Sequence, residues 1–135
     1  MKRFFLLTLA SAALLGASAA PVKTYEVKSP DGRLALVLTA GERLSFTVAR
    51  DGETLVAPSE MALTLSTGEV LGESPRVRSA RRRAVTETID APLYRQSRFD
   101  AAYNELDLRL RGDYGILARA YDDGVCYRFY TERDG

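Results

Sequence analysis

The amino-acid sequence predicts an all-β protein that folds as an antiparallel β-sandwich. Apolar and polar residues alternate with period two along most of the chain after residue 20, which is typical of strands with one buried face. Turn-forming sequences containing Gly, Pro and Asp separate these runs at short intervals. No stretch after residue 20 has the 3.6-residue period of an amphipathic helix. We therefore expect eight to ten short strands at a spacing typical of a β-sandwich.

The first nineteen residues differ from the rest and predict a cleavable secretory signal peptide (residues 1–19). Two basic residues precede an apolar run over residues 4–15, and small residues follow at 16–19. This order is that of an export signal, and we expect cleavage between Ala19 and Ala20. The apolar run is shorter than the roughly 20 residues of a membrane-spanning helix. The mature protein is therefore expected in the periplasm or outside the cell, with no membrane attachment after cleavage.

The mature chain, residues 20–135, is long enough for one modest domain. Removing Lys2 and Arg3 with the signal peptide leaves 17 basic and 18 acidic residues, a net charge of −1. This balance argues against nucleic acid as a partner.

In the first half of the mature chain, strands are expected wherever alternation is continuous. These runs cover residues 25–29, 34–38, 44–49, 53–56 and 61–66. Pro30-Asp31-Gly32 is a turn sequence, and Asp51-Gly52 predicts a hairpin. Leu63 is expected on the same face as Met61 and Leu65. The segment from 68 to 75 reads as a loop whose Val70 and Leu71 touch the core.

The second half contains two clearer hairpins. Residues 76–88 alternate less regularly, but Leu106, Leu108 and Leu110 alternate strictly with charged residues and predict a half-buried strand. Strands over 116–121 and 125–131 flank Asp122-Asp123-Gly124. The last strand is followed by a further turn sequence at 132–135, from which we expect the domain to be truncated in this chain.

The residue types exclude several kinds of active site. The chain has no histidine, which removes Ser-His-Asp triads, Cys-His pairs and the usual zinc sites. Its one cysteine, Cys126, cannot form an internal disulfide and is expected to be a buried structural thiol.

Carboxylates are the remaining candidates for chemistry. Asp122, Asp123, Glu132 and Asp134 gather toward the C-terminus and could supply oxygen ligands to calcium. An Asp-Asp-Gly sequence between two strands is, however, what a tight turn requires, and we favour a structural turn for Asp122, Asp123 and Gly124. The carboxylate of Glu105, with Asn104 before it, is expected only to cap the start of a strand.

Two further groups admit a binding role. Arg81-Arg82-Arg83 is the one basic run; we favour a place on an exposed or edge strand, where cations oppose aggregation, over a site for phosphate or acidic sugar. The second group is aromatic and could stack on sugar rings, although core positions are favoured. Its members are Tyr94, Phe99, Tyr103, Tyr114, Tyr121 and Tyr127. From the residues alone no catalytic site and no metal site is identified.

Several segments together resemble a known family. They include Ser29-Pro30-Asp31-Gly32-Arg33-Leu34, Leu63-Thr64-Leu65-Ser66 before Leu71-Gly72-Glu73, Tyr103-Asn104-Glu105-Leu106, and the block from Arg119 to Phe129. In this order and spacing they resemble the N-terminal domain of glycoside hydrolase family 97, which comprises bacterial α-glucosidases and α-galactosidases. The similarity spans the mature chain and about the first half of that domain.

The resemblance implies a β-supersandwich of the galactose-mutarotase type, incomplete in this chain, that packs on a catalytic (β/α)8 barrel. It implies α-linked oligosaccharides as substrates and calcium as a cofactor of the complete enzyme, with none bound by this chain. The catalytic carboxylates belong to later segments, so no catalytic residue is assigned within residues 20–135.

The leading hypothesis is a non-catalytic N-terminal part of an exported α-glycosidase that supports the barrel or contacts carbohydrate. The alternative is a free-standing secreted β-sandwich that binds carbohydrate or another protein. A gene remnant would have the same sequence pattern.

Overall fold

The computed structural model of the chain describes residues 21–90, 92 and 98–133. Four predictions concern residues outside this range: the signal peptide over 1–19, its cleavage between Ala19 and Ala20, the aromatic residue Tyr94 and the candidate ligand Asp134. Ten strands and no helix are found in the described part, and every strand pairing is antiparallel. The expected all-β, antiparallel fold is confirmed. Within the same residues no helix is long and apolar enough to cross a membrane.

The first sheet holds the four N-terminal strands in the order β1-β2-β3-β4. They span Lys23–Lys28 (β1), Leu34–Ala40 (β2), Leu44–Arg50 (β3) and Glu53–Glu60 (β4). The hairpin predicted at Asp51-Gly52 is confirmed, because these residues join β3 to β4 with φ values of 51° and 85°. Asp and Gly tolerate this left-handed backbone, which a tight hairpin with the right twist needs.

The second sheet has the order β10-β9-β8-β7. Its strands span Val77–Asp90 (β7), Arg98–Leu110 (β8), Tyr114–Ala120 (β9) and Val125–Thr131 (β10). The Arg81-Arg82-Arg83 run lies on β7, an edge strand as expected. The alternation at Leu106, Leu108 and Leu110 is also confirmed, since all three are at most 1% exposed.

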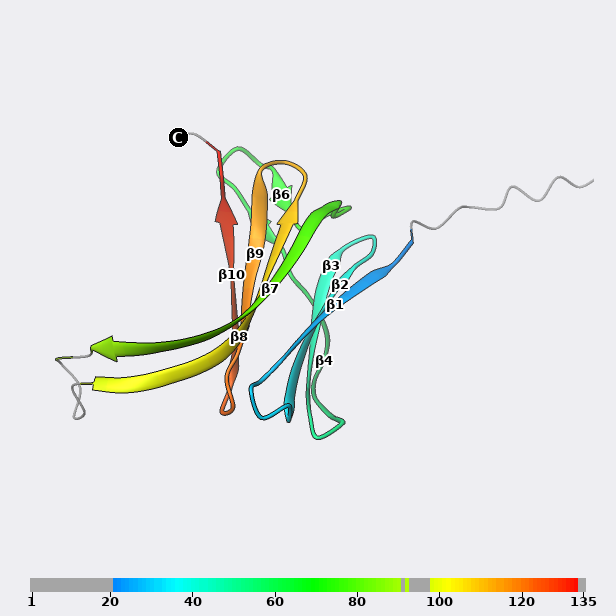
Figure 1. Cartoon of the computed structure of the whole chain (residues 1–135). Helices are drawn as coiled ribbons and strands as arrows, with labels where there is room; N and C mark the ends of the chain where they lie inside the picture. Colours follow the sequence, from blue (N-terminus) through cyan, green and yellow to red (C-terminus); the bar gives the residue numbers. More distant parts are fainter. Residues whose placement is uncertain (1–20, 91, 93–97, 134–135) are drawn as a thin grey trace, which may run out of the picture.

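The two sheets face each other and enclose one apolar core (Figure 1). Strands β1 and β2 lie against β8 and β9. The completely buried members come from both sheets: Leu36, Leu38, Leu44, Leu106, Leu108, Ile116, Ala118 and Ala120. Burying one such Leu or Ile side chain stabilises the fold by about 1.5–3 kcal/mol, so this contact between sheets is the main source of stability.

A small sheet of β5 (Leu63–Thr64) and β6 (Val70–Leu71) packs beside the sandwich. Leu71 is buried, as predicted. The expectation of one shared face for Met61, Leu63 and Leu65 is wrong: Met61 is buried, but Leu63 is 43% exposed. Only two residues of this segment pair as a strand, so the alternation does not continue along one sheet face.

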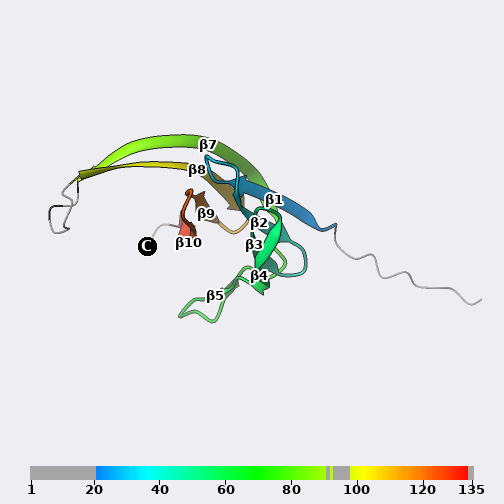
Figure 2. The same cartoon turned by 90° about the horizontal axis from the view of Figure 1, so that it is seen from below.

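Strands β7 and β8 are much longer than their neighbours and continue as a two-stranded ribbon beyond the sandwich (Figures 1 and 2). We call this distal part, residues 85–90 and 98–103, the arm. It curves over the outer side of the second sheet in Figure 2, away from the first sheet.

Cys126 is exposed, so the expectation of a buried thiol is wrong. It lies directly opposite Arg119 of β9. Ala118, the residue next to Arg119 on β9, faces the core. Because side chains alternate between faces, Cys126 is on the outer face of the sheet. Hydrophobicity alone does not distinguish this placement from burial.

Candidate functional site

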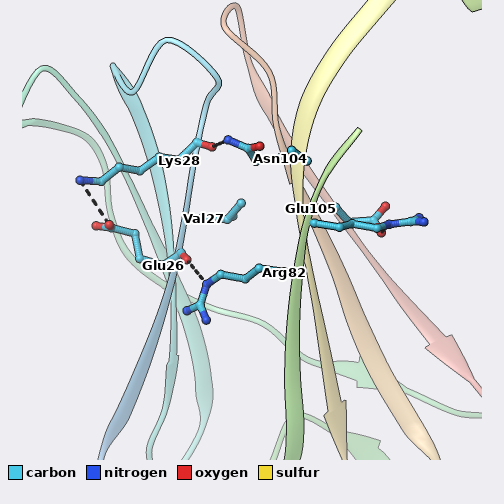
Figure 3. Close-up of a pocket in the computed structure, with 8 residues that line it drawn as sticks. Glu26, Val27, Lys28, Arg82, Asn104 and Glu105 are labelled. Atoms are coloured by element: carbon cyan, nitrogen blue, oxygen red, sulfur yellow. Dashed lines mark hydrogen bonds and ion pairs between the residues drawn. The ribbon is translucent and has the colours of Figure 1, made fainter. Parts of the chain in front are cut away.

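A groove of about 310 Å³ lies where β1, an edge strand of the first sheet, approaches β7 and β8 (Figure 3). Val27 is at its centre, between Glu26 and Lys28 of the same strand. Arg82 and Asn104 approach from the opposite side. The groove is therefore the seam between the two sheets.

Two side chains cross this seam and bind the backbone of β1. Arg82 Nε donates to the carbonyl of Glu26 at 3.0 Å, and Asn104 Nδ2 donates to the carbonyl of Lys28 at 2.8 Å. Both carbonyls belong to an edge strand and, among the strands that the structure describes, have no partner on that side. Side-chain donors thus take the place of a neighbouring strand. The side chains of Glu26 and Lys28 form an ion pair with each other, with 3.3 Å between Oε1 and Nζ.

On the other face of the same strands, Glu105 lies between two arginines. Arg83, Glu105 and Arg119 are directly opposite one another on β7, β8 and β9. Arg83 Nε is 2.5 Å from Oε1 of Glu105, and Arg119 Nε is 2.8 Å from Oε2. The Glu105 side chain is only 3% exposed. Figure 3 shows Glu105 and Asn104, adjacent in sequence, pointing to opposite sides of β8.

This arrangement keeps Glu105 ionised. Burial alone would raise the pKa of Glu105, but the hydrogen bonds from Arg83 and Arg119 favour the carboxylate and hold its pKa below the ordinary value. The same contact raises the pKa of Arg119 against the effect of its own burial. Both carboxylate oxygens are occupied, so Glu105 is not available as a general acid or base at neutral pH.

Two tyrosines complete the cluster around Arg119. The guanidinium carbon of Arg119 is 4.5 Å from the ring centroid of Tyr103, a cation–π contact, and the ring of Tyr121 is 4.9 Å from that of Tyr103. Tyr103 is 2% exposed, and its hydroxyl donates to Oε1 of Glu87 at 3.0 Å. Burial, followed by this bond to Glu87, raises the pKa of Tyr103. The polar groups of this cluster already bind one another, which favours a structural role over proton transfer.

The expectation that Asn104 and Glu105 merely cap a strand is wrong. They lie well inside β8, which begins at Arg98. Sequence reasoning missed the role of Glu105 because a charged residue on the outer face of a sheet is normally exposed. Arg83 and Arg119 lie directly opposite Glu105 only through the register of β7, β8 and β9, and this register is not readable from the sequence alone.

Asp122, Asp123 and Gly124 form the connection between β9 and β10, with the amide of Tyr121 bonded to the carbonyl of Gly124 at 2.7 Å. Asp122 also reaches the other sheet, because its Oδ1 accepts from the amide of Asp31 at 2.9 Å. Asp31 belongs to the turn between β1 and β2, so this hydrogen bond joins the β1-β2 turn to the β9-β10 turn.

The carboxylates of the described residues do not converge on a metal site. Within residues 21–90, 92 and 98–133, no group of three or more His, Cys, Asp or Glu side chains is placed to hold a metal ion. These residues therefore do not fit the calcium that the family resemblance implies for a complete enzyme.

The aromatic group is divided between core and surface. Tyr103 and Tyr114 are buried, whereas Phe99 and Tyr127 are 42% and 41% exposed. Tyr127 packs on Phe46 of the first sheet at 5.2 Å between ring centroids.

Comparison with known proteins places this architecture among larger enzymes. The family model described as "Glycosyl-hydrolase 97 N-terminal" matches residues 27–134. A retaining α-galactosidase of Bacteroides thetaiotaomicron is 37% identical over 110 residues, which is 82% of this chain and 17% of that protein.

Solved structures share the fold at low identity. A glycoside hydrolase family 97 enzyme from Pseudoalteromonas sp. strain K8, in complex with acarbose, has a TM-score of 0.71 at 16% identity. A β-arabinopyranosidase has a TM-score of 0.73 at 20% identity. In both comparisons 82% of this chain covers 18% of the other.

Proposed function

The chain belongs to the glycosyl-hydrolase 97 N-terminal family, and we propose that it is the non-catalytic N-terminal region of an exported α-glycosidase. The match of the family over residues 27–134 is the observation that carries this proposal. The chain spans about a sixth of the length of the relatives it matches. The catalytic barrel and its carboxylates then belong to later segments of a longer polypeptide.

The geometry of the site favours a structural role over catalysis. The buried carboxylate of Glu105 is fixed between two guanidinium groups, and the seam donors Arg82 and Asn104 are engaged with the β1 backbone. A glycosidase needs two carboxyl groups on either side of the scissile bond, one of which exchanges protons with the leaving oxygen. In the proposed enzyme this domain forms a rigid wall beside the barrel.

We further propose that the complete enzyme cleaves terminal α-galactosides with retention of configuration. The retaining α-galactosidase relative supports this substrate class over α-glucosides. Calcium is proposed for the complete enzyme only, with its ligands in later segments. The predicted signal peptide supports a periplasmic or secreted location.

The test is expression of the whole reading frame and assay with three nitrophenyl glycosides: α-galactoside, α-glucoside and β-arabinopyranoside. We expect hydrolysis of the α-galactoside and, by NMR of the first product, the α-anomer. The chain ending at Gly135 should give no turnover of any of the three. Turnover by that chain would contradict the non-catalytic role, and preference for another glycoside would contradict the substrate.

A further inference from the structure

The outer face of the second sheet is rich in arginine. Leu106 and Leu108 of β8 point into the core, so the residues between and beside them face away from the first sheet. The strand register arranges these outward residues in rows. One row is Arg83, Glu105, Arg119 and Cys126, and the next row is Arg81, Asp107, Leu117 and Arg128. We define the arginine face as Arg81, Arg83, Arg119 and Arg128.

Glu105 holds two of these guanidinium groups in place. It accepts from Nε of Arg83 and from Nε of Arg119, and its own side chain is only 3% exposed. Among the residues that the structure describes, Arg83 has no other side-chain partner, and its side chain is 64% exposed. A guanidinium fixed through Nε presents its terminal amino groups in a set orientation, which matches the two oxygens of a carboxylate.

The positive charge of the arginine face is only partly compensated. Glu105 is shared by two arginines. In the part of the chain that the structure describes, the side chains of Arg81 and Arg128 have no ion-pair or hydrogen-bond partner, and both are exposed. The face therefore carries an excess of cations, although the mature chain has 17 basic and 18 acidic residues.

The carboxylates nearest to the arginine face are engaged elsewhere. Asp107 lies directly opposite Arg81, but it is 3.5 Å from Nε of Arg109 and accepts from the hydroxyl of Tyr130. Glu132 is also paired with Arg109, at 3.1 Å. Within the described residues, Glu105 is thus the one carboxylate that binds arginines of this face.

A tyrosine borders the arginine face. The ring of Tyr121 is half-buried and lies 4.9 Å from the ring of Tyr103, over which the guanidinium of Arg119 is stacked. The arm, of which Tyr103 is the last residue, curves over this outer side of the sheet (Figure 2). Tyrosine offers an apolar ring and a polar hydroxyl together, which suits the surface of a sugar.

We propose that the arginine face binds an acidic oligosaccharide. A carboxylate of one sugar unit is held by Arg83 and Arg119, and a sugar ring packs beside Tyr121. A single carboxylate balances the charge that these two arginines and Glu105 leave, whereas a phosphate dianion exceeds it. The inference goes beyond the proposed function and does not rest on it, because the site takes no part in hydrolysis.

The remaining arginines extend the site along a chain of acidic sugars. The Cα atoms of Arg81 and Arg83 are about 7 Å apart, since they are two residues apart on one strand. Arg128 lies on the neighbouring strand to Arg119. Both unpaired arginines are therefore placed to meet carboxylates on adjoining sugar units.

The composition of the face favours sugar over nucleic acid or a membrane. Nucleic acid calls for a continuous basic surface, but Glu105 and Asp107 lie between the arginines. A membrane surface calls for apolar side chains that insert, and Leu117, the one aliphatic residue of the two rows, is half-buried. Separate cations next to an aromatic ring fit an oligosaccharide with separate charges.

The test uses the protein expressed from its whole reading frame and trigalacturonate as the probe. Methyl-esterified trigalacturonate has the same sugar rings without the charges, and inorganic phosphate has charge without sugar. Affinities are measured by isothermal titration calorimetry. Cys126 reports the place of binding, because it is exposed in the same row as Arg119 and its alkylation by iodoacetamide can be followed by peptide mass spectrometry.

We expect saturating trigalacturonate to slow the alkylation of Cys126 about tenfold, and the methyl ester and phosphate to leave it unchanged. Arg83→Gln should weaken binding about tenfold through the loss of charge-assisted hydrogen bonds. Arg128→Gln removes no side-chain bond within the described residues and should weaken binding about threefold, which keeps the test valid if Arg83→Gln fails to fold. Lys23→Gln removes the same charge from an exposed position on β1 and should bind like the parent protein.

Several results would overturn the inference. Equal binding of the methyl ester would show that charge is not recognised, and equal protection of Cys126 by phosphate would show a general anion site. Unchanged affinity in both arginine variants would place the probe elsewhere. A Cys126 that reacts only in urea would show that the face is covered in the whole protein. Binding to phosphatidylglycerol vesicles that is lost in Arg83→Gln would assign the face to a membrane. Hydrolysis of the α-galactoside, measured on the same preparations, bears only on the proposed function.

Discussion

Replacing Glu105 by Gln tests whether the buried carboxylate stabilises the sheet. The change keeps the size of the side chain and removes its charge. Arg119, 29% exposed, then loses its charged partner while its guanidinium still lies over Tyr103. A hydrogen bond to a charged group contributes about 1.5–3 kcal/mol, and Gln retains one acceptor oxygen, so we expect a loss of about 2 kcal/mol in the free energy of unfolding.

The direction in which the pKa of Glu105 is shifted determines how the loss of stability depends on pH. The pKa of Glu105 is lowered in the folded protein from 4.5 in the unfolded chain. Its contribution to stability is therefore complete above the unfolded value and is lost as the pH falls through the lower folded value. The difference between Glu105→Gln and the parent protein should be largest at pH 7 and shrink below pH 4.5.

Urea unfolding followed by far-UV circular dichroism at pH 7 and in acid measures both quantities. Glu53→Gln is the control, because Glu53 is an exposed glutamate on β4 of the first sheet, away from the cluster around Glu105. A Glu105→Gln protein as stable as the parent at pH 7 would refute the reasoning. So would a difference that stays constant in acid.

Two further predictions concern a glycine and a tyrosine. Gly72→Ala should destabilise the protein much more than Gly68→Ala, because a Cβ on Gly72 would lie 2.3 Å from the carbonyl oxygen of Met61, whereas Gly68 faces open space. Both glycines have positive φ, so the second variant measures backbone strain alone, about 1–2 kcal/mol, by thermal unfolding. Burial, followed by the bond to Asp107, raises the pKa of Tyr130 to about 12. Its stabilising contribution is therefore present below pH 10 and lost toward pH 12, and Tyr130→Phe should abolish this loss when unfolding is measured across that range.

The sequence-based expectations succeeded where two neighbouring residues have opposite environments. Leu108 is completely buried, and its neighbours Asp107 and Arg109 are on the outer face, so period two alone located this strand. The hairpin at Asp51-Gly52 was equally predictable, since few other residues accept its backbone angles.

The failures have a common physical cause. Alternation identifies two faces of a strand but does not say which elements cover each face. Cys126 was expected to be buried and is exposed, while Glu105 was expected only to cap the start of a strand and is buried within one. Both depend on neighbours across the sheet that are not adjacent in the sequence.

The hydrogen bonds across the seam have a consequence for the order of folding. The contacts of Asp31 with Asp122 and of Lys28 with Asn104 join residues 91 and 76 positions apart, whereas the strands within each sheet are joined mainly by short connections. Each sheet can therefore form from local hairpins, but the two sheets can pack together only when large chain loops close. During synthesis the leucines of the N-terminal sheet stay exposed until the hairpins β8-β9 and β9-β10 have been made. The interval before the sheets meet is when this chain is most exposed to aggregation.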